Sequence, residues 1–379
     1  MATVELLTQI EQGNIHKRIP VDSYDVQVKP IYEEQLKSVS VVPSVEFDPE
    51  VHLVFKKEYV NETPKMTMEE LGLTSPTQIS EVGVTNPFPL FSKEAVEIMR
   101  SEVLREEVFK NCARVSMSST SGLDAVIRGY AKDSCPFTYA AWKHPKTIEA
   151  VSLMAGVELE LIMDYEIAQI NVGMKSAEQA KNERADLARR NSLNDSYNDD
   201  IPAIVGWHND SYPFVCVLML SDTTYMIGGE TLLKTGTGKI IPTPGPSMGK
   251  AVVLQGRKIL HLAPVPLGST ERITAVSSYR AKNSLLPDTS VLKTVKPETN
   301  YGSIYNDFYP EWLNCRMKVI MDRAANIKEK FNTAAEKGEK FDKEEAFKLL
   351  KDLDAYVKHS WTEMEVSDKE YAAHFIKKN

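Results

Sequence analysis

Short runs of apolar residues, several of them alternating with polar ones, fill the middle of the chain between Tyr165 and Arg280. Turns rich in glycine and proline separate these runs, notably at Gly228-Gly229 and across Thr235–Gly249. Runs of this length and composition predict β-strands. The expected strands are Tyr165–Val172, Tyr212–Leu220, Glu230–Lys234, Ala251–Gln255, Ile259–Leu262 and Arg272–Tyr279. Short strands at this spacing are typical of an antiparallel β-barrel or sandwich.

Apolar residues recur at helical spacing on both sides of this β-rich segment. Ser92 can cap a helix, and Pro145 stands where a helix accepts proline, near its start. Beyond residue 300 the chain is highly charged, and its apolar positions keep the period of a helix. The expected helices are Ser92–Phe109, His144–Leu161, Glu311–Phe331 and Lys343–His359. Before residue 90 prolines interrupt any long element, and the short stretches Tyr24–Val28 and Val51–Phe55 alternate as strands do.

These elements predict a mainly β fold with flanking helices, in one domain over residues 1–379. Within it we expect a mixed and helical N-terminal part (1–160), a β-core (161–285) and a helical C-terminal extension (300–379). The charged, amide-rich segment Lys175–Asp200 could begin as a short helix, and its polar end predicts a mobile loop or a lid over a nearby site. The C-terminal helices could support a homodimer, or they could cover the barrel.

The composition is that of a soluble globular protein, with 42% apolar and 26% charged residues. The net charge of -8 argues against general binding to nucleic acid or to an anionic membrane surface. The chain has no apolar run of the roughly 20 residues that a membrane span needs, and its first segment lacks the pattern of a secretory signal. Its four cysteines are scattered without a C-x-x-C pair, which predicts reduced thiols in a cytoplasmic protein.

One histidine and one carboxylate stand two residues apart, at His208 and Asp210. In a strand, residues i and i+2 point to the same side, so these two side chains can converge on one point. A second imidazole, His261, follows 51 residues after Asp210 in another strand-like run. Two imidazoles and one carboxylate can occupy one face of an octahedral Fe(II) ion and leave three positions open. A structural metal site would instead close its coordination shell, commonly with thiolates.

An arginine and a threonine follow this set of potential ligands. Arg272 lies eleven residues after His261, and Thr274 shares its face of the same strand. A buried guanidinium needs an anionic partner, and its planar fork matches a carboxylate with two hydrogen bonds. The two residues therefore predict a pocket for one carboxylate of a dicarboxylic acid. Taken alone, Arg272 could instead form an internal salt bridge or be exposed at the surface.

Together these segments resemble the 2-oxoglutarate- and iron(II)-dependent dioxygenases. The matching residues are WHND (207–210), GGETLL (228–233), GKAVVLQGRKILHLA (249–263) and ERIT (271–274). The family pattern is His-x-Asp, a distant second histidine, and then Arg-x-Ser or Arg-x-Thr. The resemblance covers about Tyr165–Arg280 and implies a double-stranded β-helix, a jelly-roll or cupin-like core, with N- and C-terminal helical elaborations.

By this resemblance, Fe(II) would be held by His208, Asp210 and His261, and 2-oxoglutarate would bind it through its keto oxygen and near carboxylate. The far carboxylate would reach Arg272 and Thr274, and O2 would be consumed. Similar oxygenases of fungal secondary metabolism imply a small metabolite as substrate, in some cases an amino acid. It would be hydroxylated, desaturated or cyclised (for example to an aziridine), with succinate and CO2 as products. Halogenating relatives replace the carboxylate ligand, so an intact aspartate argues against halogenation.

Four further residues are candidates for contacts with the substrate. Gln169 and Asn171 share one face of the strand that precedes the metal strand. This face could line the site, or it could be exposed to solvent. Tyr212 has the strand parity of the two neighbouring ligands and could flank the pocket or pack as an ordinary core residue. Arg280 has the parity of the cosubstrate arginine and could bind a substrate carboxylate, although its place at the end of a strand favours exposure.

Three other functions compete with this interpretation. An iron oxidase whose substrate supplies the electrons would use Arg272 for a carboxylate of that substrate. A non-catalytic β-barrel would bind a ligand or partner and would not need a complete set of metal ligands. A zinc hydrolase is the weakest alternative, because the chain lacks a glutamate placed beside a ligand on a helix, as in H-E-x-x-H.

Overall fold

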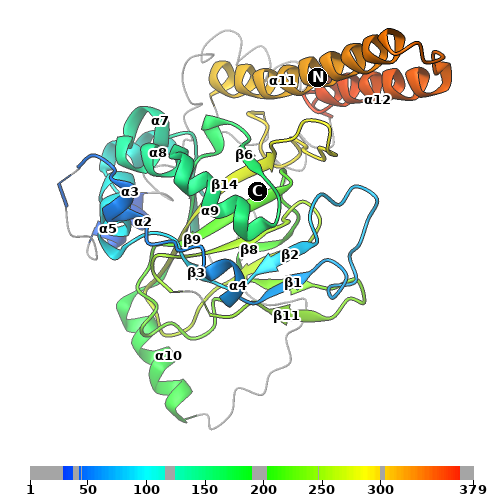
Figure 1. Ribbon diagram of the computed structural model, residues 1–379. Coiled ribbons are helices and arrows are strands. Elements are labelled where there is room, and N and C mark those ends of the chain that lie inside the picture. The colour runs from blue at the N-terminus through cyan, green and yellow to red at the C-terminus, as the bar shows by residue number, and fades with distance from the viewer. Residues whose placement is uncertain are drawn as a thin grey trace.

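The computed structural model describes residues 29–36, 42–43, 45–115, 124–189, 203–245, 247–298 and 304–367, and all structural statements concern these residues. Two antiparallel sheets face each other at the centre of the molecule (Figure 1). Helices pack on the outer face of the larger sheet, and a long helical hairpin lies at one side.

Eight consecutive strands, β7 to β14, form the core. The larger sheet contains β7 (Gln169–Met174), β9 (Phe214–Met219), β12 (Lys250–Leu254) and β14 (Glu271–Ala281). The smaller sheet contains β8 (Ala203–His208), β10 (Leu232–Lys234), β11 (Ile240–Pro242) and β13 (Leu260–Pro264). The strand orders are β12-β9-β14-β7 and β11-β10-β13-β8, so the chain crosses between the sheets at every connection except the β10–β11 hairpin. This topology is a double-stranded β-helix, or jelly roll, and the predicted fold class is confirmed.

Strands from the N-terminal half extend the larger sheet. They are β1 (Lys65–Thr67), β2 (Val82–Thr85), β3 (Phe88–Pro89), β4 (Ala113–Val115), β5 (Asp124–Ile127) and β6 (Leu159–Leu161). The pair β1–β2 joins at β12, whereas β5 and β4 join beyond β7. The extended sheet therefore ends in the edge strands β1 and β4 and is not closed into a barrel.

The helices before the core are short. They are α2 (Lys29–Leu36), α3 (Pro49–His52), α4 (Tyr59–Glu62), α5 (Lys93–Val103), α6 (Glu106–Cys112), α7 (Ala131–Ser134), α8 (Pro136–Lys143) and α9 (Pro145–Ala155). Their buried faces merge with one face of the larger sheet into the main hydrophobic cluster, which includes Phe109, Trp142 and Val172. This layer closes one side of the sheet, so the other side is left to face the smaller sheet.

Strand parity decides which side chains enter the space between the two sheets. Ile273 and Ala275 of β14 belong to the cluster beneath the helices. Val276, at the opposite parity, packs with Leu233 and Ile259 from the smaller sheet and its margin. Residues of β14 that share the parity of Val276 and lie before it, Arg272 and Thr274, therefore point into the jelly roll.

Two predicted helices are shorter in the structure. Ser92 caps α5 as expected, its side chain accepting a hydrogen bond from the backbone N–H of Ala95. The helix ends at Val103, because Arg105 is extended and its guanidinium donates to the carbonyl of Glu102, so the expected Ser92–Phe109 becomes two helices.

The expected His144–Leu161 helix ends at Ala155. Gly156 adopts a left-handed conformation there with a φ of 71° and caps the helix, and β6 follows. The strand expected from Tyr165 begins only at Gln169, because Asp164–Glu166 form a 3-10 turn.

Two other predictions need correction. Val51–Phe55 is not a strand, because Asp48 caps a short helix that has Pro49 in its first turn and that continues to His52. The run Thr235–Gly249 is not only a turn, since it contains β11. The first half of Lys175–Asp200 is helical as expected, in α10 (Ala177–Arg189). The expected strand Tyr24–Val28 and the lid after residue 189 lie outside the described residues.

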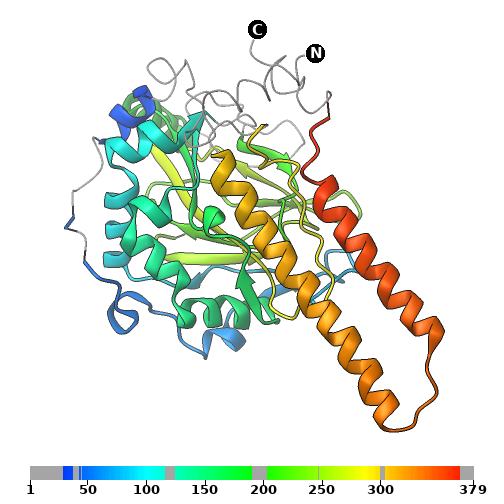
Figure 2. The same cartoon turned by 90° about the horizontal axis from the view of Figure 1, so that it is seen from above.

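The two C-terminal helices are longer than expected. They are α11 (Tyr305–Glu336) and α12 (Lys343–Thr362), which run side by side as a hairpin whose far end projects beyond the sheets (Figure 2). Asp288, on the segment after β14, accepts hydrogen bonds from Arg316 of α11 at 2.8 Å and from the hydroxyl of Tyr356 of α12 at 2.6 Å. This buried carboxylate fixes both helices to the core.

The side chains of all four cysteines are buried. Among the described residues, no helix combines the length and the apolar character that crossing a membrane requires.

Candidate metal centre

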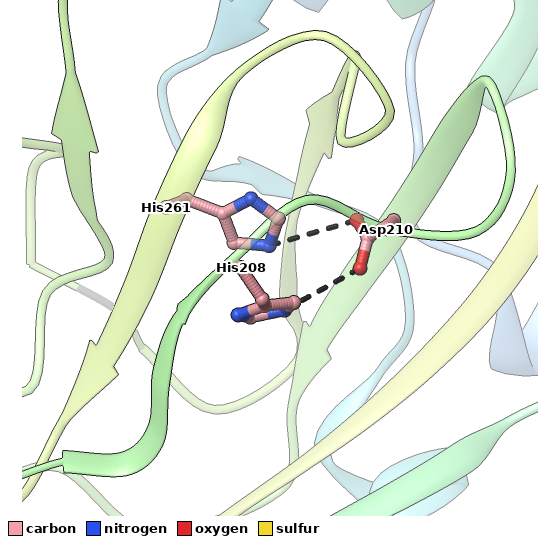
Figure 3. A group of neighbouring side chains, drawn as sticks. All are labelled: His208, Asp210 and His261. Atoms are coloured by element: carbon pink, nitrogen blue, oxygen red, sulfur yellow. Dashed lines mark ion pairs between the residues drawn. The ribbon is translucent and has the colours of Figure 1, made fainter. Parts of the chain in front are cut away.

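His208, Asp210 and His261 meet inside the jelly roll (Figure 3). His208 ends β8 and lies directly opposite His261 of β13 in the smaller sheet. The imidazole rings are 4.2 Å apart between their centroids. The Nε2 atoms of His208 and His261 each lie 3.5 Å from an oxygen of Asp210, Oδ1 and Oδ2 respectively. All three potential ligand atoms lie within 4.8 Å of one another, which one metal ion could bridge.

Backbone carbonyls orient the two imidazoles in the same way. Nδ1 of His208 is 2.7 Å from the carbonyl oxygen of Gly206, and Nδ1 of His261 is 2.9 Å from that of Ile259. A hydrogen bond from Nδ1 to a carbonyl selects the tautomer whose Nε2 carries a free lone pair. Both Nε2 atoms are therefore prepared to bind a metal.

Charges and burial within the group keep His261 and Asp210 in metal-binding forms. Burial, together with the neighbouring His208, lowers the pKa of His261 to about 4. Burial alone would raise the pKa of Asp210, yet the two imidazoles hold it below its usual value. Burial would lower the pKa of His208, but the hydrogen bond and charge of Asp210 raise it. At neutral pH His261 is thus neutral and Asp210 is ionised, as metal binding requires.

Gly256 sets the position of the carboxylate, a role that the sequence did not reveal. The backbone N–H of Asp210 donates to the carbonyl of Gly256 at 2.9 Å. A Cβ atom at Gly256 would lie only 1.7 Å from Oδ2 of Asp210. That oxygen is buried and has no hydrogen-bond partner in the described structure, as expected for an acceptor that a cation would satisfy.

Arg272 and Thr274 share the parity of Val276 on β14 and are buried in the same interior. Nε of Arg272 donates to the carbonyl of Gly229 at 3.0 Å. Gly228 and Gly229 both have a positive φ, which turns this carbonyl of the GGETLL motif toward the guanidinium. Within the described residues no carboxylate forms an ion pair with Arg272, and burial lowers its pKa to about 10 although Glu230 opposes this effect. A buried guanidinium of this kind is suited to an anionic ligand.

A polar cluster lies beside Asp210. Arg128, which follows β5, donates to Glu166 at 3.1 Å and to the side-chain oxygen of Gln169. Gln169 in turn donates to Asn171 at 3.2 Å. Tyr212, two residues after Asp210, forms a hydrogen bond with Glu166, which places this cluster near the potential metal ligands.

The cluster contains three of the four candidate substrate residues. Gln169 and Asn171 alternate with Ile170 and Val172, which lie in the cluster beneath the helices, so both amides point into the interior. The buried hydroxyl of Tyr212 donates to Glu166 at 3.3 Å. Neither Arg128 nor Glu166 stood out in the sequence, because only the pairing of β5 with β7 brings them together.

Arg280 departs from expectation. It is buried rather than exposed, because β6 pairs with the end of β14 and places Glu160 beside its guanidinium, where the two form an ion pair. The Arg280 side chain also contacts Cys315 of α11. Because Arg280 already pairs with Glu160 and contacts Cys315, we do not assign it to the site.

A pocket of about 1070 Å³ has His208 and Asp210 in its wall. Its other side is formed by the end of α12 and the residues after it, including Thr362, Glu363 and Glu365. Arg257 and Lys293 add positive charge to its lining. Two of the three potential metal ligands thus border a space large enough for a small molecule.

Comparison with known proteins found no matching family model and no matching curated protein. Among solved structures, a prolyl 4-hydroxylase from Phytophthora capsici is 12% identical, over 89% of this chain and 96% of its own, with a TM-score of 0.37. A prolyl-4-hydroxylase from Pseudomonas putida is 16% identical over 53% of this chain and 94% of its own, with a TM-score of 0.32. A 2OG-Fe(II) oxygenase family oxidoreductase from Burkholderia pseudomallei is 16% identical over 43% and 70%, with a TM-score of 0.30. Because these TM-scores lie below 0.5, we base the function on the chain's own residues.

Proposed function

We propose that this protein is an Fe(II)- and 2-oxoglutarate-dependent oxygenase that oxidises an unactivated C–H bond of a small metabolite and releases succinate and CO2. The observation that carries the proposal is the meeting of His208, Asp210 and His261 inside the jelly roll, with all donor atoms within 4.8 Å. Two imidazoles and one carboxylate suit Fe(II), and three ligands leave positions open for other molecules. The buried, unsatisfied Oδ2 of Asp210 fits a cation at this point.

The metal and the side chains around it would have separate roles. Bound iron would supply the redox chemistry with O2, and the protein would orient the reactants and exclude water. Arg272 would bind the far carboxylate of 2-oxoglutarate through its guanidinium, with the hydroxyl of Thr274 as a further donor. This assignment rests on the burial of Arg272 in the same interior and on the lack of a carboxylate partner among the described residues.

The polar cluster beside Asp210 supports an amino acid as the substrate. Arg128 and Glu166 form a buried ion pair there, and Nε of Arg128 is buried without a hydrogen-bond partner among the described residues. Isolating such a pair from water is costly and contributes little net stability, which favours a role in binding. An α-amino acid carries both complementary charges, so its carboxylate would bind Arg128 and its ammonium group Glu166.

Succinate release tests this function directly. The purified protein is loaded anaerobically with Fe(II) and 2-oxoglutarate and is then exposed to O2 with a panel of amino acids. We expect one or more to stimulate succinate formation in proportion to the substrate consumed. Product formation without succinate would contradict the use of 2-oxoglutarate and support the oxidase alternative, and a chain that takes up no Fe(II), Mn(II) or Co(II) would instead be a binding protein.

The same assay tests the substrate class. For an active amino acid, the matching N-acetyl derivative removes the ammonium charge and the matching amide removes the carboxylate charge. We expect both derivatives to lose most of the stimulation. Equal stimulation by the derivatives would refute the amino-acid assignment while leaving the oxygenase assignment intact.

A further inference from the structure

The hairpin of α11 and α12 carries exposed apolar residues at regular spacing. On α11 they are Leu313, Met317 and Met321, one helical turn apart. On α12 they are Phe347, Leu350, Val357 and Trp361, at steps of three, seven and four residues, with the exposed Asp354 at the position between Leu350 and Val357. These side chains are between 38% and 64% exposed. A stripe of this kind is typical of a helix that packs against another helix.

Both stripes lie on the same side of the hairpin. The helices contact each other through residues such as Arg316 of α11, which donates to the hydroxyl of Ser360 of α12 at 2.8 Å. Met317 and Trp361 each follow such a contact residue by one position, which is a rotation of about 100° around the helix. Because the two helices are antiparallel, equal rotations turn both stripes toward the same side. The other stripe residues keep this offset, so the hairpin has one apolar face, which only Asp354 of α12 interrupts within the stripe.

The area of this face fits a protein interface. At about 200 Å² for a fully exposed large side chain, the exposed fractions correspond to roughly 650 Å² of apolar surface. A stable interface buries about 800 Å² on each partner, of which about 57% is apolar, or roughly 450 Å². The hairpin face alone therefore supplies more apolar surface than one side of a standard dimer needs. It also exceeds the largest apolar patch of many monomers.

The geometry points to a second copy of this chain as the partner, with the two hairpins packed face to face as a four-helix bundle. A two-fold axis brings the same surface of each copy together, and a hairpin with its apolar side chains on one face is complementary to itself. The projection of the hairpin beyond the sheets leaves its far half accessible to another molecule (Figure 2). The interface would also adjoin the active-site pocket, because Trp361 directly precedes Thr362 in the pocket wall.

Sedimentation velocity of the full-length protein tests this interface. We expect a mass twice the 42.6 kDa of the chain at micromolar concentration. The exchange Leu350→Lys places a charge in the centre of the face and, since leucine and lysine have similar helix propensities, preserves α12. It should weaken dimerisation at least tenfold. The control is Val51→Lys, which changes a similarly exposed apolar residue on α3, outside the hairpin.

Circular dichroism and thermal melts of each variant confirm that it is folded. A monomeric wild-type protein at 100 µM would overturn the inference. It would do so even if another protein or another segment of the chain covers the face. A dimer that persists in Leu350→Lys and in the double variant Met321→Lys/Leu350→Lys would also overturn it, because the contact would then use another surface. Loss of the dimer in Val51→Lys as well would show that the effect is not specific to the hairpin.

Discussion

Replacing Gly256 with alanine adds one methyl group beside the carboxylate of Asp210. The new carbon would lie 1.7 Å from Oδ2 and 2.7 Å from Cγ of Asp210. The backbone of Gly256 lies outside the left-handed region, so alanine introduces no backbone strain. Any effect therefore comes from the space that the methyl group takes from the carboxylate.

The size of the effect follows from these distances. A carbon–oxygen contact without strain needs about 3.3–3.6 Å, so Oδ2 would have to move by roughly 1.6–1.9 Å. Metal–ligand distances tolerate only about 0.2 Å of change. Changes that only perturb the surroundings of a ligand typically cost 10- to 100-fold in metal affinity. A displaced ligand should cost more, and we expect a loss of at least about 100-fold for Gly256→Ala.

Titration of the metal-free protein with Co(II) or Mn(II) by calorimetry measures this loss. The matched control is Gly245→Ala, because a Cβ atom at Gly245 would meet only an oxygen of Glu230 at 3.9 Å. The control should bind metal like the wild type. Thermal melts without metal show whether either variant is folded. If folded Gly256→Ala binds metal as tightly as wild type, then Asp210 is not a ligand in the position that the structure gives it.

Local periodicity predicted the short strands of an antiparallel barrel or sandwich, and the resemblance to a known family supplied the jelly roll and the convergence of the three ligands. Alternation at two-residue spacing fixes which residues share a side of a strand, and it grouped Arg272 with Thr274 and Gln169 with Asn171, while the structure shows that these sides face the interior. The order of the strands then brings β8 and β13 together, so that His208 and His261 become neighbours.

Features that depend on distant pairing could not be predicted in this way. Arg128 reaches the site because β5 adds to the edge of the sheet at β7, and the sequence analysis assigned no strand there. Arg280 was expected at the surface, but β6 and α11 cover the end of β14. The importance of Gly256 follows from a single short distance that no sequence pattern encodes.

Three further predictions concern the cosubstrate, the substrate and the attachment of the hairpin. Arg272→Ala should raise the required concentration of 2-oxoglutarate about 30- to several thousand-fold, since losing a buried charge-assisted pair costs about 2–5 kcal/mol. A larger effect on the KM for the substrate would contradict this role of Arg272. Arg128→Met should raise the KM for an amino-acid substrate more than that for 2-oxoglutarate, and steady-state kinetics that show the reverse would remove Arg128 from the substrate site. Asp288→Asn should destabilise the fold by about 3–5 kcal/mol in chemical denaturation, because it leaves the fully buried Arg316 without its anionic partner. Burial alone would raise the pKa of Asp288, yet Arg316 and hydrogen bonds from Ser290 and Tyr356 hold it below its usual value. A carboxylate whose pKa is lower in the folded than in the unfolded chain stabilises the fold above its ordinary pKa of about 4, and this contribution disappears as the pH falls below that value. The wild type should therefore lose thermal stability below about pH 4 more steeply than Asp288→Asn, and parallel curves would show that Asp288 does not stabilise the attachment of the hairpin through its charge.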